Sequence, residues 1–199
     1  MIPMDEERMI KLLNSQIRNY YGNVFWTHKI HEKDADTFRA WNNILKIAQI
    51  VLSAFSTTGL VYIMLGVDKS TTVADNYLCI RAAAIISALL SALLVIVNSL
   101  SKGYDLGELS ASHGATAVKL LDIREEYLSL LYDIKGRNVS VEIIQKRRDK
   151  LKENTLAIYA NAPRTTSYGY KEAAKAIENG EPFFTKDSLN KILPIDLQE

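Results

Sequence analysis

Two uncharged apolar segments constrain the fold of this chain more than any other feature. The first covers residues 47–67 (IAQIVLSAFSTTGLVYIMLGV) and the second residues 82–100 (AAAIISALLSALLVIVNSL). Each is close to the roughly 20 residues that a helix needs to cross a hydrocarbon layer about 30 Å thick. A helix on the surface of a soluble core would carry charged side chains along one face, and neither segment does. We therefore predict two membrane spans; a buried helical hairpin in a soluble bundle is the alternative.

The distribution of Lys and Arg predicts the orientation of these spans. Of the 24 basic residues, seven lie in residues 1–46, fifteen in residues 101–199, and only Lys69 and Arg81 in the connecting segment. Cytoplasmic flanks of spans are enriched in Lys and Arg. The sequence thus predicts an all-α protein with three parts: N-terminal cytoplasmic helices (1–46), a transmembrane hairpin (47–100) and a C-terminal cytoplasmic helical region (101–199).

Residues outside the spans show the 3–4 spacing of amphipathic helices. We expect a first helix from Asp5 and a second from near Lys33 into the first span. After the second span, the apolar positions from Leu106 to Ile134 alternate steps of three and four, as in a coiled-coil seam. Gly136 ends that helix, and Ser140 begins another with the same spacing. We expect these two helices to form an antiparallel pair that packs on the N-terminal helices or on another protomer, and a short helix near residues 187–194.

Three histidines interrupt this pattern. His113 lies in the apolar seam, where a hydrogen-bonded interior histidine is the main expectation and a ligand contact or pH-sensitive group the alternative. His28 and His31 have a spacing that could hold a metal, but no third ligand shares their face and their neighbours are charged residues expected in solvent. We predict no metal site.

Both spans carry small and hydroxylated residues at helical spacing. In lipid, such residues let helix backbones approach closely, so they predict a helix-packing face within the hairpin or between protomers. A sharper alternative is that they line a narrow aqueous path in an oligomer. The residues assigned to this face are Ser53, Thr57, Ala84, Ser87, Ala88, Ser91 and Ala92.

Two groups of basic residues are candidate contacts for a nucleotide or another anion. One is in the run KRRDKLK and comprises Lys146, Arg147 and Arg148. The other is Arg164 with Lys171, beside the start of a short helix expected from about Tyr168, where free backbone N–H groups attract anions. A solvated helix face and simple helix capping are the respective alternatives.

The sequence contains no signature of an enzyme. It has no glycine-rich phosphate loop, no HExxH or paired-cysteine metal motif and no serine framed by glycines. We predict no catalytic residues and no cofactor. Because acidic and basic residues nearly balance, at a net charge of +1, the whole-chain charge does not favour nucleic acid as a partner.

The order of segments resembles a known family. A charged N-terminal stretch (FWTHKIHEKDADTFRAWNN) leads into two spans, followed by ELSASHGATAVKLLDIREEYLSLLYDI and then NAPRTTSYGYKEAAKAI. This arrangement is similar to the SLATT family, the two-span effector domains of bacterial conflict systems. The resemblance covers roughly residues 15–180 and rests on architecture and loose motifs, and the family has no agreed catalytic residues to carry over.

The resemblance implies a function at the bacterial inner membrane. It implies an effector that forms homo-oligomeric pores or disrupts the bilayer when a nucleotide-derived signal arrives, halting infected cells before phage can spread. A nucleotidyltransferase or nucleotide-sensing protein encoded nearby is the implied partner, and a cyclic nucleotide the implied ligand. The alternative is a non-conducting membrane anchor that recruits a cytoplasmic partner through its long helix pair.

Overall fold

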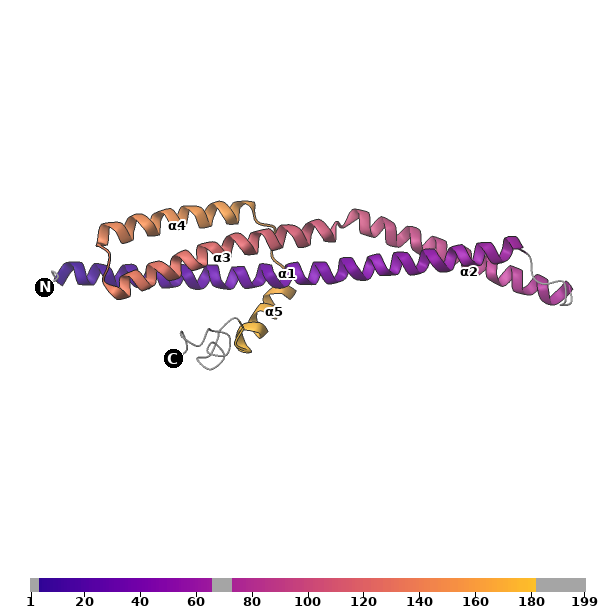
Figure 1. Cartoon of the computed structure of the whole chain (residues 1–199), viewed down its shortest axis with the longest axis horizontal. Helices are drawn as coiled ribbons and strands as arrows, with labels where there is room; N and C mark the ends of the chain where they lie inside the picture. Colours follow the sequence, from indigo (N-terminus) through magenta and orange to yellow (C-terminus); the bar gives the residue numbers. More distant parts are fainter. Residues whose placement is uncertain (1–3, 66–72, 182–199) are drawn as a thin grey trace, which may run out of the picture. The chain divides into compact units, whose positions relative to one another are not determined.

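The computed structural model describes residues 4–65 and 73–181. Of these residues, 91% are helical and none forms a strand. The helices are α1 (Met4–Leu65), α2 (Val73–Gly103), α3 (Leu106–Gly136), α4 (Val141–Asn161) and α5 (Ser167–Glu178), shown in chain order in Figure 1. The predicted all-α fold with two apolar helices long enough to span a membrane is confirmed.

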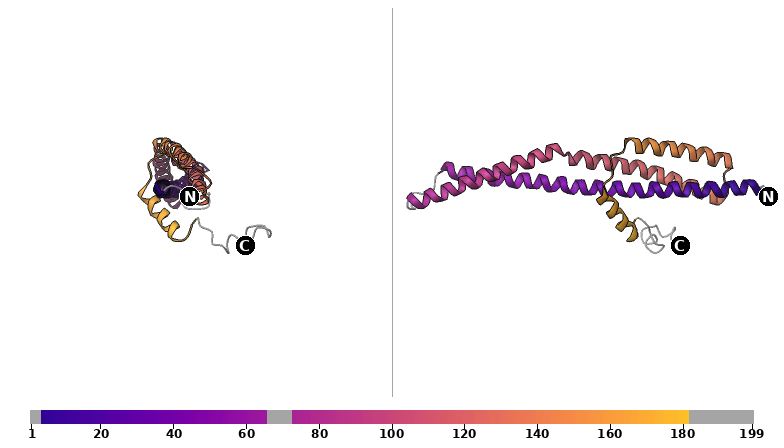
Figure 2. Two further views of the ribbon diagram at one scale, coloured as in Figure 1. Left: turned by 90° about the vertical axis from the view of Figure 1, so that its left-hand side faces the viewer. Right: turned by 180° about the vertical axis from the view of Figure 1, so that it is seen from behind.

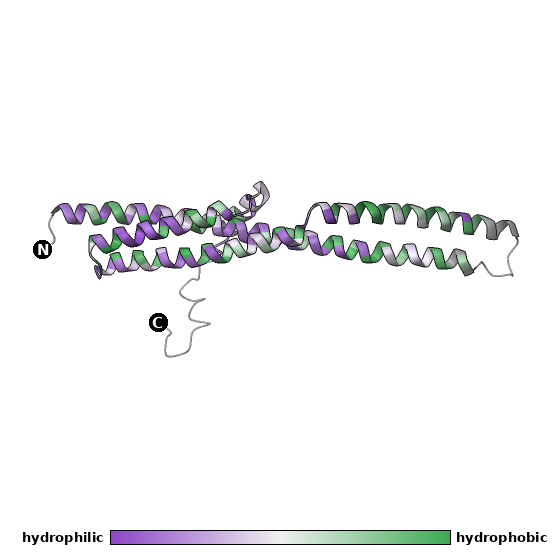
Figure 3. Ribbon diagram, turned by 90° about the horizontal axis from the view of Figure 1, so that it is seen from above, coloured by the Kyte–Doolittle hydropathy of each residue, from purple (hydrophilic) through white to green (hydrophobic). Residues whose placement is uncertain are grey.

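The chain folds into two compact units. Unit 1 combines residues 1–37 with residues 110–199, and unit 2 comprises residues 38–109. The start of α1 therefore packs with α3, α4 and α5, whereas unit 2 holds the rest of α1 and all of α2. Figure 3 shows the difference in composition: α2 is mostly hydrophobic, whereas polar and apolar residues alternate along α3 and α4.

Unit 1 is a three-helix bundle with α5 docked on it. The views in Figure 2 show α1, α3 and α4 side by side. Its apolar core contains Leu13, Ile17 and Val24 of α1. The core residues of α3 and α4 are Leu120, Ile123, Tyr127, Leu130, Ile134, Ile144 and Leu151. The predicted antiparallel pair thus packs on the N-terminal helix. The buried stripe of α3 follows the predicted seam from His113 to Ile134, whereas Leu109 of that seam is exposed.

One local prediction is wrong. The N-terminal region is one helix, not two, because α1 runs unbroken from Met4 to Leu65. No proline interrupts it, and Gly22 is a single weak position that the packed helix tolerates. α2 begins at Val73, within the segment 68–81 that joins the two predicted spans. The helix predicted near residues 187–194 lies outside the described residues.

The ends of the remaining helices agree with the sequence. α3 ends at Gly136, and Ser140 occupies the N-cap position of α4, although its side chain makes no capping hydrogen bond. α5 begins one residue before the expected Tyr168, and Thr166 is its N-cap: the Thr166 hydroxyl accepts a hydrogen bond from the Gly169 N–H at 2.9 Å.

Candidate functional site

Unit 2 is a hairpin whose two helices meet along a narrow polar seam. The Ser56 and Ser91 hydroxyl oxygens are 2.6 Å apart, and both Ser56 and Ser87 are buried. A Cβ atom on Gly59 would overlap the Ser87 hydroxyl, so a larger residue at this position would displace that side chain from the hairpin seam. Hydrogen bonding and small residues, which drive helix association in lipid, therefore hold this hairpin together.

The residues that the sequence analysis placed on one face differ in exposure. Ser87 and Ser91 lie against α1, whereas Ala84, Ala88 and Ala92 are exposed along the edge of that face. Ser53 and Thr57 of α1 are also exposed, and the Thr57 hydroxyl donates a hydrogen bond to the Ser53 carbonyl at 2.9 Å.

Residues that the sequence analysis did not single out complete the hairpin seam. Ser56 and Gly59 meet Ser87 and Ser91, and the less exposed positions of α2 (Ile80, Ala83, Ser87, Leu90, Leu94 and Val97) follow alternating steps of three and four. That 3–4 spacing is the signal that could have distinguished the packed face from the alanine face.

A buried polar layer crosses unit 1 at the end where the chain passes into unit 2. His31 and Asp34 of α1 and His113 of α3 are each at most 2% exposed. The two histidine Nδ1 atoms are 2.9 Å apart, and the His113 Nδ1 lies 3.8 Å from an Asp34 carboxylate oxygen. The Ser110 hydroxyl adds a hydrogen bond of 2.8 Å to the Ala35 carbonyl.

This layer confirms one prediction about the histidines and corrects another. His113 is an interior, hydrogen-bonded histidine, as expected. His28 and His31, however, are buried and not among solvated charges. They continue the buried stripe of α1 with the same 3–4 spacing, and that continuation is the signal that could have placed them inside. Within the described residues, no group of three His, Cys, Asp or Glu side chains forms a potential metal site.

Burial controls the charge of these histidines. Desolvation lowers the pKa of His31 to about 4, assisted by the neighbouring His113 and opposed by Asp34. Desolvation also lowers the pKa of His113 and His28. At neutral pH the histidines of the layer are therefore uncharged, and one can donate the shared Nδ1 hydrogen bond while the other accepts it.

Asp34 connects the polar layer to the start of α5. Its carboxylate accepts hydrogen bonds from the backbone N–H of Thr166, at 2.9 Å, and from the Thr166 hydroxyl. Gly169 packs directly on this carboxylate. An internal anion thus occupies the N-terminal end of α5, where the free N–H groups favour negative charge.

Contacts farther along α5 hold it against α1. The Trp26 and Tyr170 rings meet edge to face with centroids 5.4 Å apart, and Ala173 and Ala176 are buried. Glu181, just beyond the helix, lies 3.1 Å from both the Lys29 and Lys33 ammonium groups. α5 is therefore anchored at both ends.

The predicted anion contacts are distributed over separate elements. On α4, Arg147 forms an ion pair with Asp133 at 2.5 Å. Arg148 forms an ion pair with Asp149 and donates a hydrogen bond to the Gln16 amide oxygen. Lys146 is exposed. Arg164 and Lys171 are exposed beside the start of α5. The anion position at that helix start is taken by Asp34, so their role in binding an external anion stays a prediction.

The hairpin, the bundle and the apolar helices define an all-helical membrane protein with two spans. Only 6% of each apolar window is buried inside the structure, whereas a hairpin in the core of a soluble bundle would be mostly buried. The chain belongs to family 4 of the SMODS and SLOG-associating 2TM effector domains, whose family model matches residues 13–188. Comparisons with curated proteins and with solved structures found no match.

Membership assigns the general role of the chain. It is a membrane effector of conflict systems, of a type that is not a known enzyme family. The match begins at Leu13 in the core of unit 1 and ends beyond α5, so it includes the bundle, the polar layer and the hairpin.

The depressed pKa of His31 predicts that acid weakens the fold. Below about pH 6.5 the unfolded chain binds a proton at His31 that the folded chain rejects until about pH 4. The free energy of unfolding should therefore be highest above pH 6.5 and decrease toward pH 4, by up to about 1.4 kcal/mol per pH unit for one proton. The variant His31→Asn does not titrate, so its pH dependence should be shallower. Denaturant unfolding of the detergent-solubilised protein, followed by tryptophan fluorescence, measures this; identical pH slopes would contradict the assignment.

The packing of Gly169 on Asp34 predicts a specific effect of a methyl group. Gly169→Ala should displace the Asp34 carboxylate, break its bonds to Thr166 and destabilise the docking of α5 by about 1–3 kcal/mol. Gly22→Ala is the matched control, because nothing lies within 4 Å of its Cβ position and alanine favours a helix. Hydrogen exchange should be faster throughout α5 in the first variant only. Unchanged protection of α5 in Gly169→Ala would refute this role of the contact.

Proposed function

We propose that this effector acts by oligomerising in the bacterial inner membrane and making the bilayer leak when a nucleotide-derived signal reaches unit 1. The observation that carries the proposal is the alanine face of α2. Ala84, Ala88 and Ala92 recur every four residues and remain exposed after the hairpin has formed. Small residues at this spacing permit close contact between helices in lipid, so this face suits a neighbouring protomer.

The wetted surface of the leak would come from the other exposed polar positions. Ser53 and Thr57 share one side of α1, away from the Ser56 contact with Ser91. In an oligomer joined through the alanine faces, their hydroxyls are available to an aqueous path. Ser87 and Ser91 would keep the hairpin closed, and no single hairpin encloses a pore, so several copies are required.

The orientation and the partner complete the proposal. The fifteen Lys and Arg residues after the second span and the seven before the first support cytoplasmic termini. The family is defined by association with SMODS and SLOG proteins. We infer a partner that makes or senses a nucleotide, with a cyclic nucleotide as the candidate signal.

Leucine at the centre of the alanine face should abolish the leak. Ala88→Leu blocks close approach of a second α2, so expression together with the activating partner in a bacterial host should no longer depolarise the cell, although the protein still inserts. Ala82→Leu is the matched control, since Ala82 is exposed but lies about 120° around the helix from Ala88. A potential-sensitive dye reports the difference at equal membrane levels of protein. Depolarisation by both variants would refute the alanine contact. If the unaltered protein also failed to depolarise the cell, the non-conducting anchor would be favoured.

A further inference from the structure

A groove between α1 and α3 of unit 1 is lined by residues that belong neither to the polar layer nor to the hairpin seam. It encloses about 570 Å³, within the range of about 300–1,000 Å³ typical of small-molecule sites. Its walls are one face of each helix, at spacings of three, four and seven residues. The lining residues are Asn14, Arg18 and Tyr21 from α1, and Leu128, Leu131, Tyr132 and Lys135 from α3.

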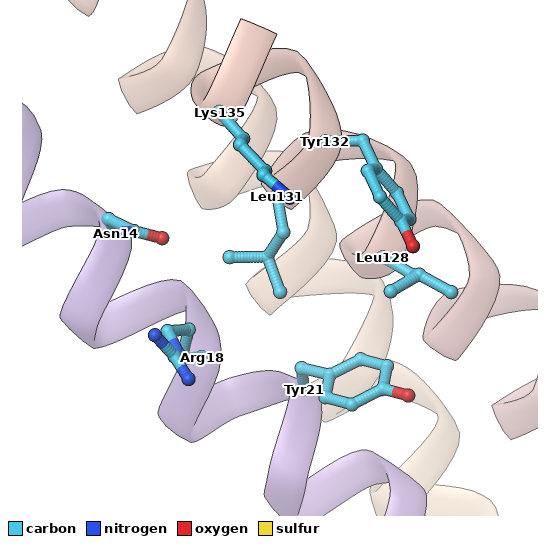
Figure 4. Close-up of a pocket in the computed structure, with 7 residues that line it drawn as sticks. All are labelled: Asn14, Arg18, Tyr21, Leu128, Leu131, Tyr132 and Lys135. Atoms are coloured by element: carbon cyan, nitrogen blue, oxygen red, sulfur yellow. The ribbon is translucent and has the colours of Figure 1, made fainter. Parts of the chain in front are cut away.

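The two ends of the groove differ in chemistry. Because α1 and α3 are antiparallel, Asn14 and Lys135 lie toward one end and Tyr21 and Tyr132 toward the other, with Leu131 between them (Figure 4). One end therefore offers ammonium, guanidinium and amide donors, and the other offers phenol rings above an apolar floor. A complementary ligand is negatively charged at one end and flat at the other.

The cations at the basic end are not neutralised by nearby carboxylates. Among the ion pairs of the described residues, none involves Arg18 or Lys135, whereas the neighbouring acid Asp133 is engaged by Arg147. A second cavity of about 680 Å³ shares Asn14 and Lys135 and extends the basic end; it adds Arg8, Lys11 and Arg137, with Glu7 4.0 Å from Arg137. The local charge therefore favours an anion over a neutral or cationic ligand.

We propose that this groove binds a nucleotide, with its phosphate at Arg18 and Lys135 and its base between Tyr21 and Tyr132. A guanidinium and an ammonium together suit a phosphate, since one binds its oxygens as a planar fork and the other as a point charge. Stacking of a base on an aromatic side chain contributes about 1–3 kcal/mol and tolerates any base. The Asn14 amide can bond the sugar or phosphate oxygens.

The groove would be the place where the signal binds the proposed effector. Nucleotide binding itself does not depend on the proposed function; only the effect of binding on the membrane rests on it. A ligand in the groove contacts α1, which continues without a break into the first span, and α3, which carries His113 of the polar layer. The groove lies at least 26 residues in sequence from either span, in a part of the chain that the bilayer does not need to cover.

Calorimetric titration of the full chain in maltoside micelles, in phosphate-free buffer, tests the site. The probes are the four ribonucleoside 5′-monophosphates and inorganic phosphate. We expect at least one nucleotide to bind about tenfold more tightly than phosphate, which corresponds to about 1.4 kcal/mol for the base. The double variant Arg18→Glu/Lys135→Glu should lose binding of both kinds of probe. Lys119→Glu/Lys150→Glu changes the net charge equally at exposed positions outside the groove and should bind as the unaltered protein does.

Tyr132→Ala separates the two ends of the groove. Tyr132 is 64% exposed, so its truncation should leave the bundle folded. The variant should lose about tenfold in nucleotide affinity and keep its affinity for phosphate. Failure of all four nucleotides to bind, or unchanged nucleotide binding in this variant, would overturn the proposal. Binding of phosphatidylglycerol vesicles but no nucleotide would instead assign the basic end to lipid headgroups and equally overturn it.

These binding measurements are independent of the leak. Nucleotide binding that is lost in Arg18→Glu/Lys135→Glu, in a protein that never depolarises membranes, would support the groove and refute the proposed function. Depolarisation that depends on Ala88, in a protein whose groove binds no nucleotide, would do the reverse.

Discussion

The carboxylate of Asp34 is the group on which the organisation of unit 1 depends. A buried charge is costly unless hydrogen bonds compensate it. Asp34 is 1% exposed and faces His113, the N–H and hydroxyl of Thr166 and the backbone of Gly169. These partners come from α3 and from the start of α5. One side chain of α1 thus connects three helices, and the apolar core beyond it sets the register in which they meet.

The polar layer and the hairpin seam both place polar side chains between packed helices, one in the helical bundle of unit 1 and the other in the hairpin of unit 2. In unit 1 the hydrophobic effect packs Leu13, Ile17 and Val24 against α3, and the polar layer interrupts that core. In unit 2 a bilayer would remove the hydrophobic drive between helices, and Ser56, Gly59, Ser87 and Ser91 provide close approach and hydrogen bonding instead. Because α1 is a single helix, both arrangements act on the same element.

Much of the fold follows from periodicity in the sequence. From His113 to Ile134 the seam predicted the buried face of α3, and the two uncharged segments predicted the long apolar helices. The candidate site was less predictable. Polar residues such as His31 and Asp34 are expected to face solvent, and their burial depends on hydrogen-bond partners 80 or more positions away in the sequence. The division of α2 into a serine face and an alanine face likewise depended on which side α1 occupies. The spacing of residues shows which of them share a face of a helix, but it does not show which other helix packs against that face.

The central claim, that α1 and α2 form a membrane hairpin with both flanks in the cytoplasm, is tested most directly through the single cysteine. Cys79 lies near the start of α2, before the second uncharged segment. In cells with a permeabilised outer membrane, a membrane-impermeant maleimide should label Cys79, whereas Cys79→Ser/Lys102→Cys should be labelled only after lysis. Both proteins should stay in the membrane pellet after alkaline carbonate extraction. Release into the supernatant, or labelling of position 102 before lysis, would contradict the account.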